Sequence, residues 1–370
     1  MKKVLVLHTS VGHGIRITAQ NIYSQLLQSG KFEVRIADFH EVEPGLIVEI
    51  LEKIYFFSTE KVSWIWAVLY SEAVASLTIP LRMLTASFRY KRILAEIRKF
   101  EPDIVISTET VPSGVIAYLK RKKLYSGKLI VAFSDYHLHR FWLYDECDLY
   151  LCNIAEQAEK LKALGIPEHK IAVTGMIIAP KYLHKIPRQQ ARKEAGLQSE
   201  LSAVLVSGGR RGLIASFEIV SELQKSGTPF AIAVVTGKNR DLKTRLSALP
   251  HSPNHPLQIF EYVTNQDVLM SAVDLLISKP GGPTIAEAVG KNLPIILTDA
   301  HPGHEQANLD YLVEHGIVQY GRTHMEVGQL AEKILAGEIK YDHAYAVEKL
   351  LKPKGAVSLT AALLRLNMNS

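Results

Sequence analysis

The sequence has few cysteines, no long charge-free apolar run and no low-complexity tract. Its two cysteines, Cys147 and Cys152, have the spacing of neither a redox pair nor a zinc knuckle. We therefore favour a reduced cytosolic chain without a structural metal, in which both thiols are buried apolar filler. The most apolar stretch, residues 62–80, contains Glu72 and several Ser and Thr, which is unfavourable in about 30 Å of hydrocarbon. We expect no transmembrane span.

The charge of the chain does not select a partner. The sequence is 47% hydrophobic and 22% charged, which is typical of a folded globular protein. Its net charge of +6 suits nucleic acid, an anionic membrane surface or a phosphorylated ligand equally well. Because the basic residues accompany an apolar stretch and no recognised nucleic-acid module is present, we expect no nucleic-acid partner.

Short β-branched runs alternate with helical patterns along the chain, which is typical of parallel sheets flanked by helices. The 370 residues favour two domains, and we predict an α/β fold of two Rossmann-like parallel-sheet domains facing a cleft, with ligands at the carboxyl edges of the sheets. The predicted parts are an N-terminal domain (1–178), a linker (179–200), a C-terminal domain (201–345) and a C-terminal helix (346–370), with packing of that helix on the first domain as one option. The predicted strands are 4–8, 32–37, 104–107, 129–133, 149–152, 171–173, 203–207, 230–235, 258–260, 275–278 and 295–298.

Glycines follow the first predicted strand of each sheet. Gly12 and Gly14 lie where a strand turns into a helix, and either close packing or the approach of a ligand to the helix start accounts for them. Gly208 and Gly209 occupy the equivalent turn of the second domain, and Arg210 follows them. Such a turn can cradle a diphosphate with the arginine adding charge; a solvated surface arginine is the alternative.

The most specific pattern is the segment 278–288, Ser-Lys-Pro-Gly-Gly-Pro-Thr-Ile-Ala-Glu-Ala. A strand ends where the segment begins, the glycine pair turns the chain, and Pro283 suits the first turn of a helix whose start attracts phosphate. Glu287 is either a carboxylate stabilised by the helix dipole or a bidentate acceptor for two ribose hydroxyls, and we favour the second. The candidate ligand-binding residues of this turn are Lys279, Gly281, Gly282, Pro283, Thr284 and Glu287.

A second polar turn follows one strand-helix unit later, at residues 301–308, His-Pro-Gly-His-Glu-Gln-Ala-Asn. It is dense in groups able to bond sugar hydroxyls. Helix capping would explain such a composition as well, but its position favours a hexose site. The candidates here are Gly303, His304, Glu305 and Asn308.

Together these motifs resemble those of the family 28 glycosyltransferases, in the branch with monogalactosyldiacylglycerol synthases and processive diacylglycerol glucosyltransferases; the peptidoglycan N-acetylglucosaminyl transferase is a more distant relative. The segment 279–287 is similar to the family's Lys-Pro-Gly-Gly nucleotide motif, and 302–308 is similar to its Pro-Gly-Gln-Glu-x-x-Asn sugar motif, with His304 in place of Gln. The resemblance implies the two-domain fold called GT-B and a UDP-sugar donor. It also implies that the main chain around Val263 holds the uracil, Glu287 the ribose, Glu305 the hexose, and the pairs Gly208-Gly209 and Gly281-Gly282 the diphosphate.

The sequence departs from the family where the catalytic base is expected. Sugar transfer with inversion needs a base for the proton of the acceptor hydroxyl. The family's first loop ends Gly-x-Gly-His, and alignment on the glycines puts Ile15 at the histidine position. Either His13 serves, or Asp135, His137 or His139 takes the proton, or activity has been lost.

An apolar, aromatic segment at 46–98 is the candidate membrane contact. Its aromatic residues and the basic residues that follow suit the headgroup layer of an anionic leaflet; core helices with solvated ends are the alternative. The residues concerned are Tyr55, Phe56, Phe57, Trp64, Trp66, Tyr70, Arg82, Arg89, Lys91, Arg92, Arg98 and, just beyond it, Lys99.

We therefore expect an inverting glycosyltransferase that moves a hexose from a UDP-sugar to a membrane lipid such as diacylglycerol, peripheral on the cytoplasmic face of the cell membrane. No cofactor is expected, and no metal, because no well-placed Asp-x-Asp motif is present and helix termini can stabilise the leaving UDP. Three alternatives stay open: an N-acetylglucosamine transferase acting on a polyprenyl-linked acceptor, a UDP-sugar 2-epimerase, and an inactive UDP-sugar sensor.

Overall fold

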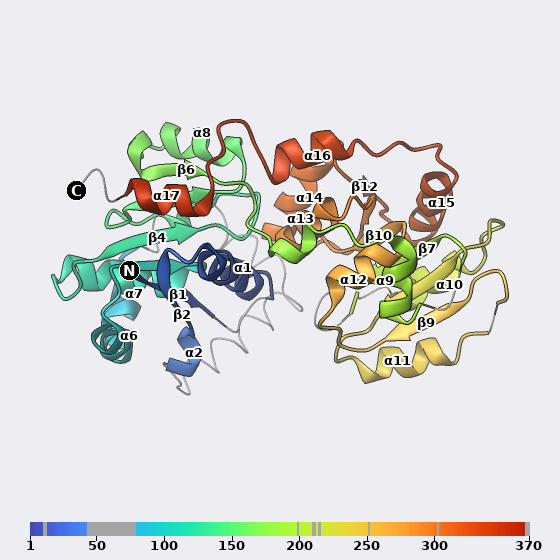
Figure 1. The fold of residues 1–370 in the computed structure, drawn as a ribbon, viewed down its shortest axis with the longest axis horizontal. Helices are drawn as coiled ribbons and strands as arrows, with labels where there is room; N and C mark the ends of the chain where they lie inside the picture. Colours follow the sequence, from blue (N-terminus) through green and yellow to red (C-terminus); the bar gives the residue numbers. More distant parts are fainter. Residues whose placement is uncertain are drawn as a thin grey trace. The chain divides into compact units, whose positions relative to one another are not determined.

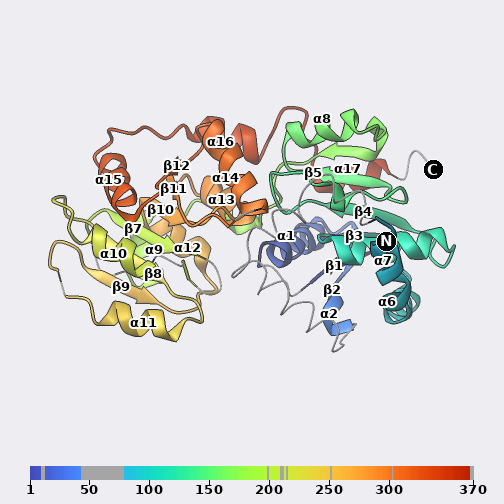
Figure 2. The same cartoon turned by 180° about the vertical axis from the view of Figure 1, so that it is seen from behind.

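The computed structural model describes residues 1–9, 13–42, 79–197, 200–208, 212–213, 216–250, 252–301 and 303–366. The chain divides into two compact units (Figures 1 and 2). The first unit comprises Met1–Ala179, His301–His304 and Glu348–Ser370, and the second comprises Pro180–Ala300 and Glu305–Val347. Each unit is built around one six-stranded sheet.

The sheet of the first unit has the strand order β2-β1-β3-β4-β5-β6, and every neighbouring pair is parallel. Its four inner strands are almost wholly buried, as expected of a parallel sheet covered on both faces. The strands are β1 (Lys2–His8), β2 (Phe32–Asp38), β3 (Ile104–Ser107), β4 (Lys128–Ala132), β5 (Leu149–Cys152) and β6 (Ile171–Val173).

Helices cover both faces of this sheet because successive residues of a strand point to opposite sides. Val4 packs in a core with Ile22 of α1 and Leu363 of α17, whereas Leu5 packs in a second core with Ile93 of α6. The last helix of the chain thus completes the core of the first unit. The helices of this unit are α1 (His13–Ser29), α2 (Phe39–Val42), α6 (Ile79–Phe100), α7 (Thr110–Arg121), α8 (Ala155–Ala163) and α17 (Leu359–Arg365), with short 3-10 helices η1 (Arg140–Trp142) and η2 (Glu168–Lys170).

The sheet of the second unit is also parallel throughout, with the order β12-β11-β10-β7-β8-β9. The chain builds this sheet outward from β7 in one direction through β8 and β9, and then in the other direction from β10 to β12. Open α/β sheets bind ligands at such a reversal, here between β7 and β10, beyond the carboxyl ends of the strands. The strands are β7 (Ala203–Ser207), β8 (Ala231–Val235), β9 (Leu257–Phe260), β10 (Leu275–Ser278), β11 (Ile295–Leu297) and β12 (Gln319–Tyr320).

One face of this second sheet buries the apolar sides of α10, α11 and α15, which share a core with β7, β8 and β10. The helix α9 packs against α12. The helices are η3 (Pro180–Tyr182), α9 (Arg188–Ala195), α10 (Ser216–Leu223), α11 (Arg240–Ser247), α12 (Gln266–Ala272), α13 (Gly282–Gly290), α14 (His304–Glu314) and α15 (His324–Leu335), and α16 (His343–Leu350) continues from this unit into the first.

The predicted two-sheet architecture is confirmed, and each predicted strand lies within two residues of an observed one. Two features differ from the prediction. The two-residue strand β12 was not predicted, and the stretch interpreted as a linker, 179–200, contains η3 and α9. A helix of eight residues with a low apolar content gives little periodic signal, so its place is decided by packing against α12.

The two cysteines are buried in the first unit, as the sequence predicted. Burial raises the pKa of the Cys147 thiol to about 12, and burial also raises the pKa of Cys152. Only the thiolate reacts as a nucleophile. We therefore expect both residues to resist a thiol reagent such as 5,5′-dithiobis(2-nitrobenzoate) at pH 8 in the folded protein and to react fully in denaturant. Rapid labelling of the native chain would contradict this assignment.

Candidate functional site

Two polar turns of the second unit lie side by side, because β10 and β11 are neighbouring parallel strands and each turn follows one of them. Lys279 Nζ lies 2.6 Å from Glu305 Oε1. The Asn308 side-chain amide donates to the Pro280 carbonyl oxygen at 3.0 Å, and Asn308 is fully buried. The segments 279–287 and 305–308, separate in the sequence, therefore form one constellation in the second unit.

This constellation gives two of the predicted sugar-binding residues partners within the protein. The Glu305 side chain is 6% exposed and is paired with Lys279, which is 37% exposed. A buried carboxylate held in this way has a fixed orientation. Asn308 holds the nucleotide turn through its amide, which makes it a residue that positions the turn.

The start of α13 is built for an anion. Gly281 is the N-cap, with φ −81° and ψ 119°, and no side chain caps the helix. Pro283 lies in the first turn, where its missing N–H is no loss. A Cβ placed on Gly281 would meet only Thr284 Oγ1, at 4.0 Å. The fold itself thus does not require glycine at this position, and the space beside the helix start is open to a ligand.

Glu287 lies one turn further along α13 and is only 5% exposed. The Tyr182 side chain of η3 lies near this carboxylate. Burial, with the nearby charges of Glu287 and Asp267, raises the pKa of Tyr182, so the hydroxyl stays protonated and able to donate. Lys181 in turn forms an ion pair with Asp267 at 2.9 Å. The segment interpreted as a linker therefore brings a hydroxyl close to the candidate ribose acceptor, which the sequence did not suggest.

Gly208 has a different constraint from Gly281. A Cβ on Gly208 would lie 2.4 Å from both the backbone nitrogen and Cα of Leu213. The chain folds back on this position through Gly212, whose φ is +75°. Glycine is therefore required at 208 by the loop's own packing. Gly209 and Arg210, the other candidates of this turn, lie outside the described residues.

Val263, the candidate for the uracil contact, lies half-buried between β9 and α12. Beside it, Glu261 forms an ion pair with Lys243, which lowers the pKa of the Glu261 carboxyl. Lys181 Nζ lies 3.4 Å from the Thr264 carbonyl oxygen. This loop is thus anchored on both sides of Val263.

The backbone after β11 is strained. Asp299 has φ +53°, in the left-handed region, where a residue other than glycine costs about 1–3 kcal/mol. The Thr298 hydroxyl lies 3.4 Å from Asp299 Oδ1. Gly303, a few residues on, has φ +102°, which suits only glycine. The sharp turn into α14 begins here and sets the position of His304 and Glu305.

In the first unit, the predicted base lies at the edge of what the structure describes. Gly12 and the side chain of His13 lie outside the described part, while His13 and Gly14 begin the α1 backbone. Ile15, at the family's histidine position, has its carbonyl oxygen bound by the hydroxyl of buried Thr108, at 3.1 Å.

The alternative bases follow β4 at the carboxyl edge of the same sheet. The Ser134 hydroxyl lies 3.1 Å from Asp135 Oδ2, and Asp135 and His137 are half-buried. His139 is 1% exposed and caps η1, since its Nδ1 accepts a hydrogen bond from the Phe141 N–H at 3.2 Å. That nitrogen's lone pair is thereby occupied, which leaves the ring proton on Nε2.

A histidine that the sequence did not single out lies at the same edge. His8 is the last residue of β1, and its register partner is Asp38, the last residue of β2. His8 Nδ1 lies 3.1 Å from the Thr9 carbonyl oxygen and 3.7 Å from Asp38 Oδ2. The one signal in the sequence was a histidine ending an otherwise apolar strand, with an aspartate ending the next.

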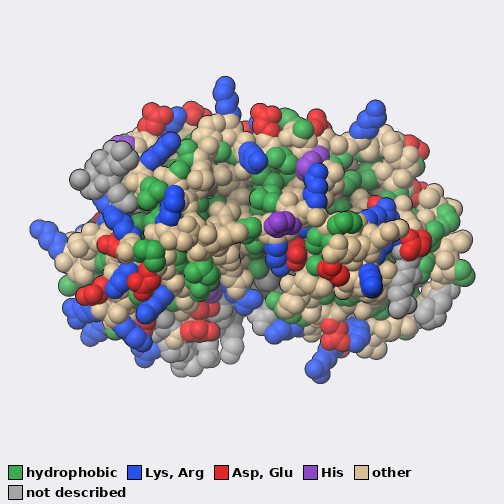
Figure 3. Space-filling view, in the orientation of Figure 1, with side chains coloured by type: hydrophobic (Ala, Val, Ile, Leu, Met, Phe, Trp, Pro, Cys, Tyr) green, Lys and Arg blue, Asp and Glu red, His purple; other side chains and the backbone are tan. Residues whose placement is uncertain are grey.

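Much of the candidate membrane segment lies outside the described residues, including Tyr55, Phe56, Phe57, Trp64, Trp66, Tyr70 and the side chains of Arg82 and Arg89. In the described half of α6, Ile93, Leu94 and Ile97 are buried in the first unit's core, and the basic residues Lys91, Arg92, Arg98 and Lys99 are exposed. No helix in the described part of the chain is long and apolar enough to cross a bilayer. On the face shown in Figure 3, basic and acidic side chains are interspersed.

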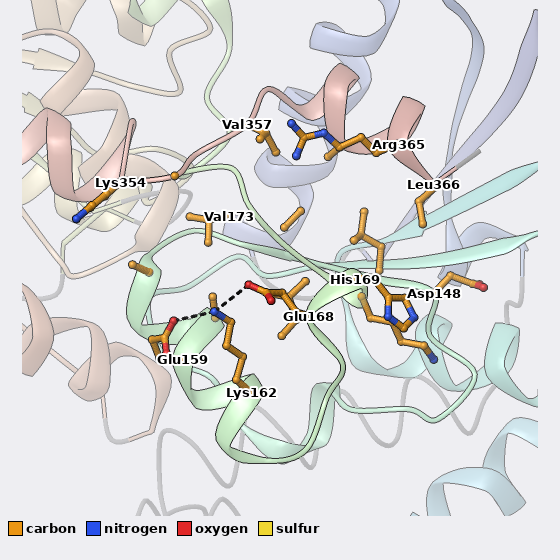
Figure 4. Close-up of a pocket in the computed structure, with 18 of the residues that line it drawn as sticks. Asp148, Glu159, Lys162, Glu168, His169, Val173, Lys354, Val357, Arg365 and Leu366 are labelled. Carbon is orange, nitrogen blue, oxygen red and sulfur yellow. Dashed lines mark hydrogen bonds and ion pairs between the residues drawn. The ribbon is translucent and has the colours of Figure 1, made fainter. Parts of the chain in front are cut away.

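A separate cavity of about 560 Å³ lies in the first unit (Figure 4). Its lining includes Lys128, Leu149 and Ile171, which begin β4, β5 and β6. It therefore lies towards the amino ends of the strands, away from the edge where such sheets bind ligands. Figure 4 shows Lys162 reaching Glu159 and Glu168, with ion pairs of 3.1 and 3.3 Å. Within the described residues, no group of three His, Cys, Asp or Glu side chains is placed to hold a metal ion.

Each half of the chain matches the model of a known glycosyltransferase family. The model of monogalactosyldiacylglycerol (MGDG) synthase matches residues 16–178, and the model of the glycosyltransferase family 28 C-terminal domain matches residues 203–357. The processive diacylglycerol beta-glucosyltransferase of Bacillus pumilus (strain SAFR-032) is 26% identical over 344 residues, which cover 92% of this chain and 88% of that protein.

Solved structures share the fold. A UDP-glucosyltransferase from Polygonum tinctorium has a TM-score of 0.60 at 13% identity, covering 100% of this chain and 97% of that one. A UDP-GlcNAc 2-epimerase from Neisseria meningitidis, bound to UDP-GlcNAc, has a TM-score of 0.60 at 14% identity and covers 100% of both chains. Because proteins of different activity match equally well, this likeness establishes the fold alone.

Proposed function

Since this chain belongs to glycosyltransferase family 28 and has the GT-B fold, we propose that it transfers a hexose from a UDP-sugar to the hydroxyl of a membrane lipid such as diacylglycerol, with inversion at the anomeric carbon. The observation that carries the proposal is the pairing of the two turns after β10 and β11 through Lys279–Glu305 and Asn308–Pro280. A nucleotide turn and a sugar turn held together at one sheet edge suit a donor that carries both groups.

The donor is proposed to lie along the carboxyl edge of the second sheet. Its diphosphate meets the start of α13, where the N-cap glycine leaves room and the helix dipole favours negative charge. Glu287 accepts the ribose hydroxyls and Glu305 those of the hexose. The leaving UDP is stabilised by helix N–H groups without a metal ion.

The acceptor side of the proposal concerns the first unit. The processive relative is named for diacylglycerol and glucose, and we propose the same class of lipid acceptor for this chain. The hydroxyl of such a lipid stays at the bilayer surface, so the protein must work there. We propose peripheral binding at the anionic, cytoplasmic face of the cell membrane through the aromatic and basic segment at 46–98.

The rival functions differ in measurable ways. A 2-epimerase would interconvert UDP-sugars without any lipid, a sensor would bind UDP-sugar without turnover, and a polyprenyl-dependent transferase would ignore diacylglycerol. The Bacillus pumilus relative, which aligns over 92% of this chain, is named as a diacylglycerol glucosyltransferase and so favours transfer to diacylglycerol over epimerisation.

The test is to incubate the protein with radiolabelled UDP-glucose, UDP-galactose or UDP-N-acetylglucosamine and vesicles containing diacylglycerol, and to follow label into the organic phase. Transfer from a UDP-hexose to diacylglycerol is expected. UDP binding without transfer from any donor would contradict the proposal in favour of the sensor, and label found only in an epimeric UDP-sugar would favour the epimerase.

Tyr182→Phe tests whether the segment before α9 orients Glu287. The change removes a hydroxyl that lies beside the buried Glu287 carboxylate and can donate to it, and a hydrogen bond to a charged group contributes about 1.5–3 kcal/mol. Part of this is recovered when Glu287 turns to the ribose, so we expect the UDP dissociation constant to rise about threefold to tenfold. Isothermal titration of UDP measures it, with Tyr345→Phe as control. Equal affinity in both variants would show that Tyr182 does not position Glu287.

A further inference from the structure

We propose that His8, oriented by Thr9 and Asp38, is the base that removes the proton from the acceptor hydroxyl. This inference rests on the proposed function. It addresses the position at which the family's loop histidine is replaced by Ile15. The supporting observation is a histidine and a carboxylate brought together by strand pairing at the carboxyl end of the first sheet.

The strands place this pair where ligands of α/β sheets are bound. His8 and Asp38 are register partners at the ends of β1 and β2, and the carboxyl edge of such a sheet is its ligand-binding edge. The next described element along the chain is α1, which begins at His13. The two side chains are 9% and 10% exposed, so the pair is largely withdrawn from bulk water.

The geometry selects one tautomer of the ring. Both oxygens near Nδ1, the Thr9 carbonyl at 3.1 Å and the Asp38 carboxylate at 3.7 Å, are acceptors. The neutral ring therefore carries its proton on Nδ1 and leaves the lone pair on Nε2. A base needs that lone pair, and a carbonyl or carboxylate behind the opposite nitrogen is the usual way in which proteins orient one.

His139, at the same edge, has the opposite arrangement. Its Nδ1 accepts from the Phe141 N–H, so that lone pair is already used within the protein. Asp135 is engaged by the Ser134 hydroxyl at 3.1 Å. Compared with His139 and Asp135, His8 has the contacts that prepare a nitrogen to accept a proton.

The step balances without a co-reactant. The acceptor oxygen forms a bond to the anomeric carbon while the bond from that carbon to the diphosphate oxygen breaks, and UDP leaves with the electron pair. The proton of the acceptor hydroxyl moves to His8 Nε2. The positive imidazolium then faces Asp38, and the proton passes to solvent before the next turnover.

The experiment compares His8→Gln and His8→Gly with the unaltered chain and with His255→Gln. His255 is a matched control, because it is also a buried histidine, with its ring between two backbone carbonyls in the second unit. For both His8 variants we expect kcat for transfer to fall about 10²–10⁴-fold, with UDP affinity unchanged. Added imidazole should restore part of the rate of His8→Gly but not raise that of His255→Gln, which keeps the kcat of the unaltered chain.

Each other result counts against the role of His8. Normal kcat in His8→Gln, with a large loss in His13→Ala, would overturn the inference while leaving the proposed function intact. Loss of UDP affinity along with rate in both variants, or folded His8→Gly that imidazole does not rescue, would reduce His8 to a structural residue. If the unaltered chain transfers no hexose from any donor, the proposed function fails first and the role of His8 fails with it.

Discussion

Gly208→Ala is expected to lower the stability of the second unit by about 3 kcal/mol, at the upper end of the cost of overpacking. The added methyl would sit 2.4 Å from the backbone of Leu213, and backbone cannot move aside as a flexible side chain does. In a unit of this size the change corresponds to a fall of about 6–12 °C in Tm. Differential scanning calorimetry measures it.

Gly281→Ala is the matched comparison, because the same methyl there meets only Thr284 Oγ1, at 4.0 Å, in an ordinary backbone conformation. We expect Tm to change by no more than about 1–2 °C, because changes of this kind shift stability by less than about 0.5 kcal/mol, while UDP affinity falls because the methyl occupies the approach to α13. Equal losses of Tm in the two variants would show that both glycines serve only the fold. A Gly281→Ala protein with full UDP affinity would remove the diphosphate from the start of α13.

Glu287→Ala is expected to raise the UDP dissociation constant by about tenfold to a hundredfold, since a charged hydrogen-bond partner of the ligand contributes about 1.5–3 kcal/mol. Glu287 is buried, so little ordering is needed when the ribose binds. Titration calorimetry with UDP and with uracil separates the contribution of the ribose diphosphate from that of the base, because uracil lacks both the ribose and the diphosphate.

The informative comparison is Glu287→Gln, which keeps the shape and one acceptor oxygen. Its loss of affinity should be smaller than that of Glu287→Ala. Unchanged UDP affinity in both variants, with Tm retained, would exclude Glu287 from the nucleotide site.

The sequence was sufficient to predict the sheets because the strands are buried on both faces and contain short apolar runs. Ile104–Ser107 and Leu275–Ser278 are runs of three apolar residues followed by a serine, and both were predicted with their observed ends. The strand β12 has only two residues, Gln319 and Tyr320, both half-buried. Its place is decided by pairing with β11, which no local pattern reveals.

The candidate site was predicted residue by residue but not as a set of contacts. Lys279 and Glu305 are 26 positions apart and meet only because β10 and β11 are neighbours. Tyr182 reaches Glu287 from a stretch interpreted as a linker. His8 was not predicted as a site residue because it ends an apolar strand and so resembles a strand residue. Its partner Asp38 is 30 positions away and is brought beside it only by the pairing of β1 with β2. Motifs reveal residue types at fixed spacing, whereas long-range partners depend on the order of strands.

The return of α17 to the first sheet has a consequence for synthesis. Leu359, Ala362 and Leu363 share a core with Val4 and Val6, so β1 is made long before the helix that covers it. The nascent chain leaves the ribosome with that apolar face of the first sheet uncovered, while the second unit, whose sheet is contiguous from β7 to β12, can already close. Folding of the first unit is thus expected to finish only after α17 has been made, and in that interval a holdase chaperone has a surface to cover.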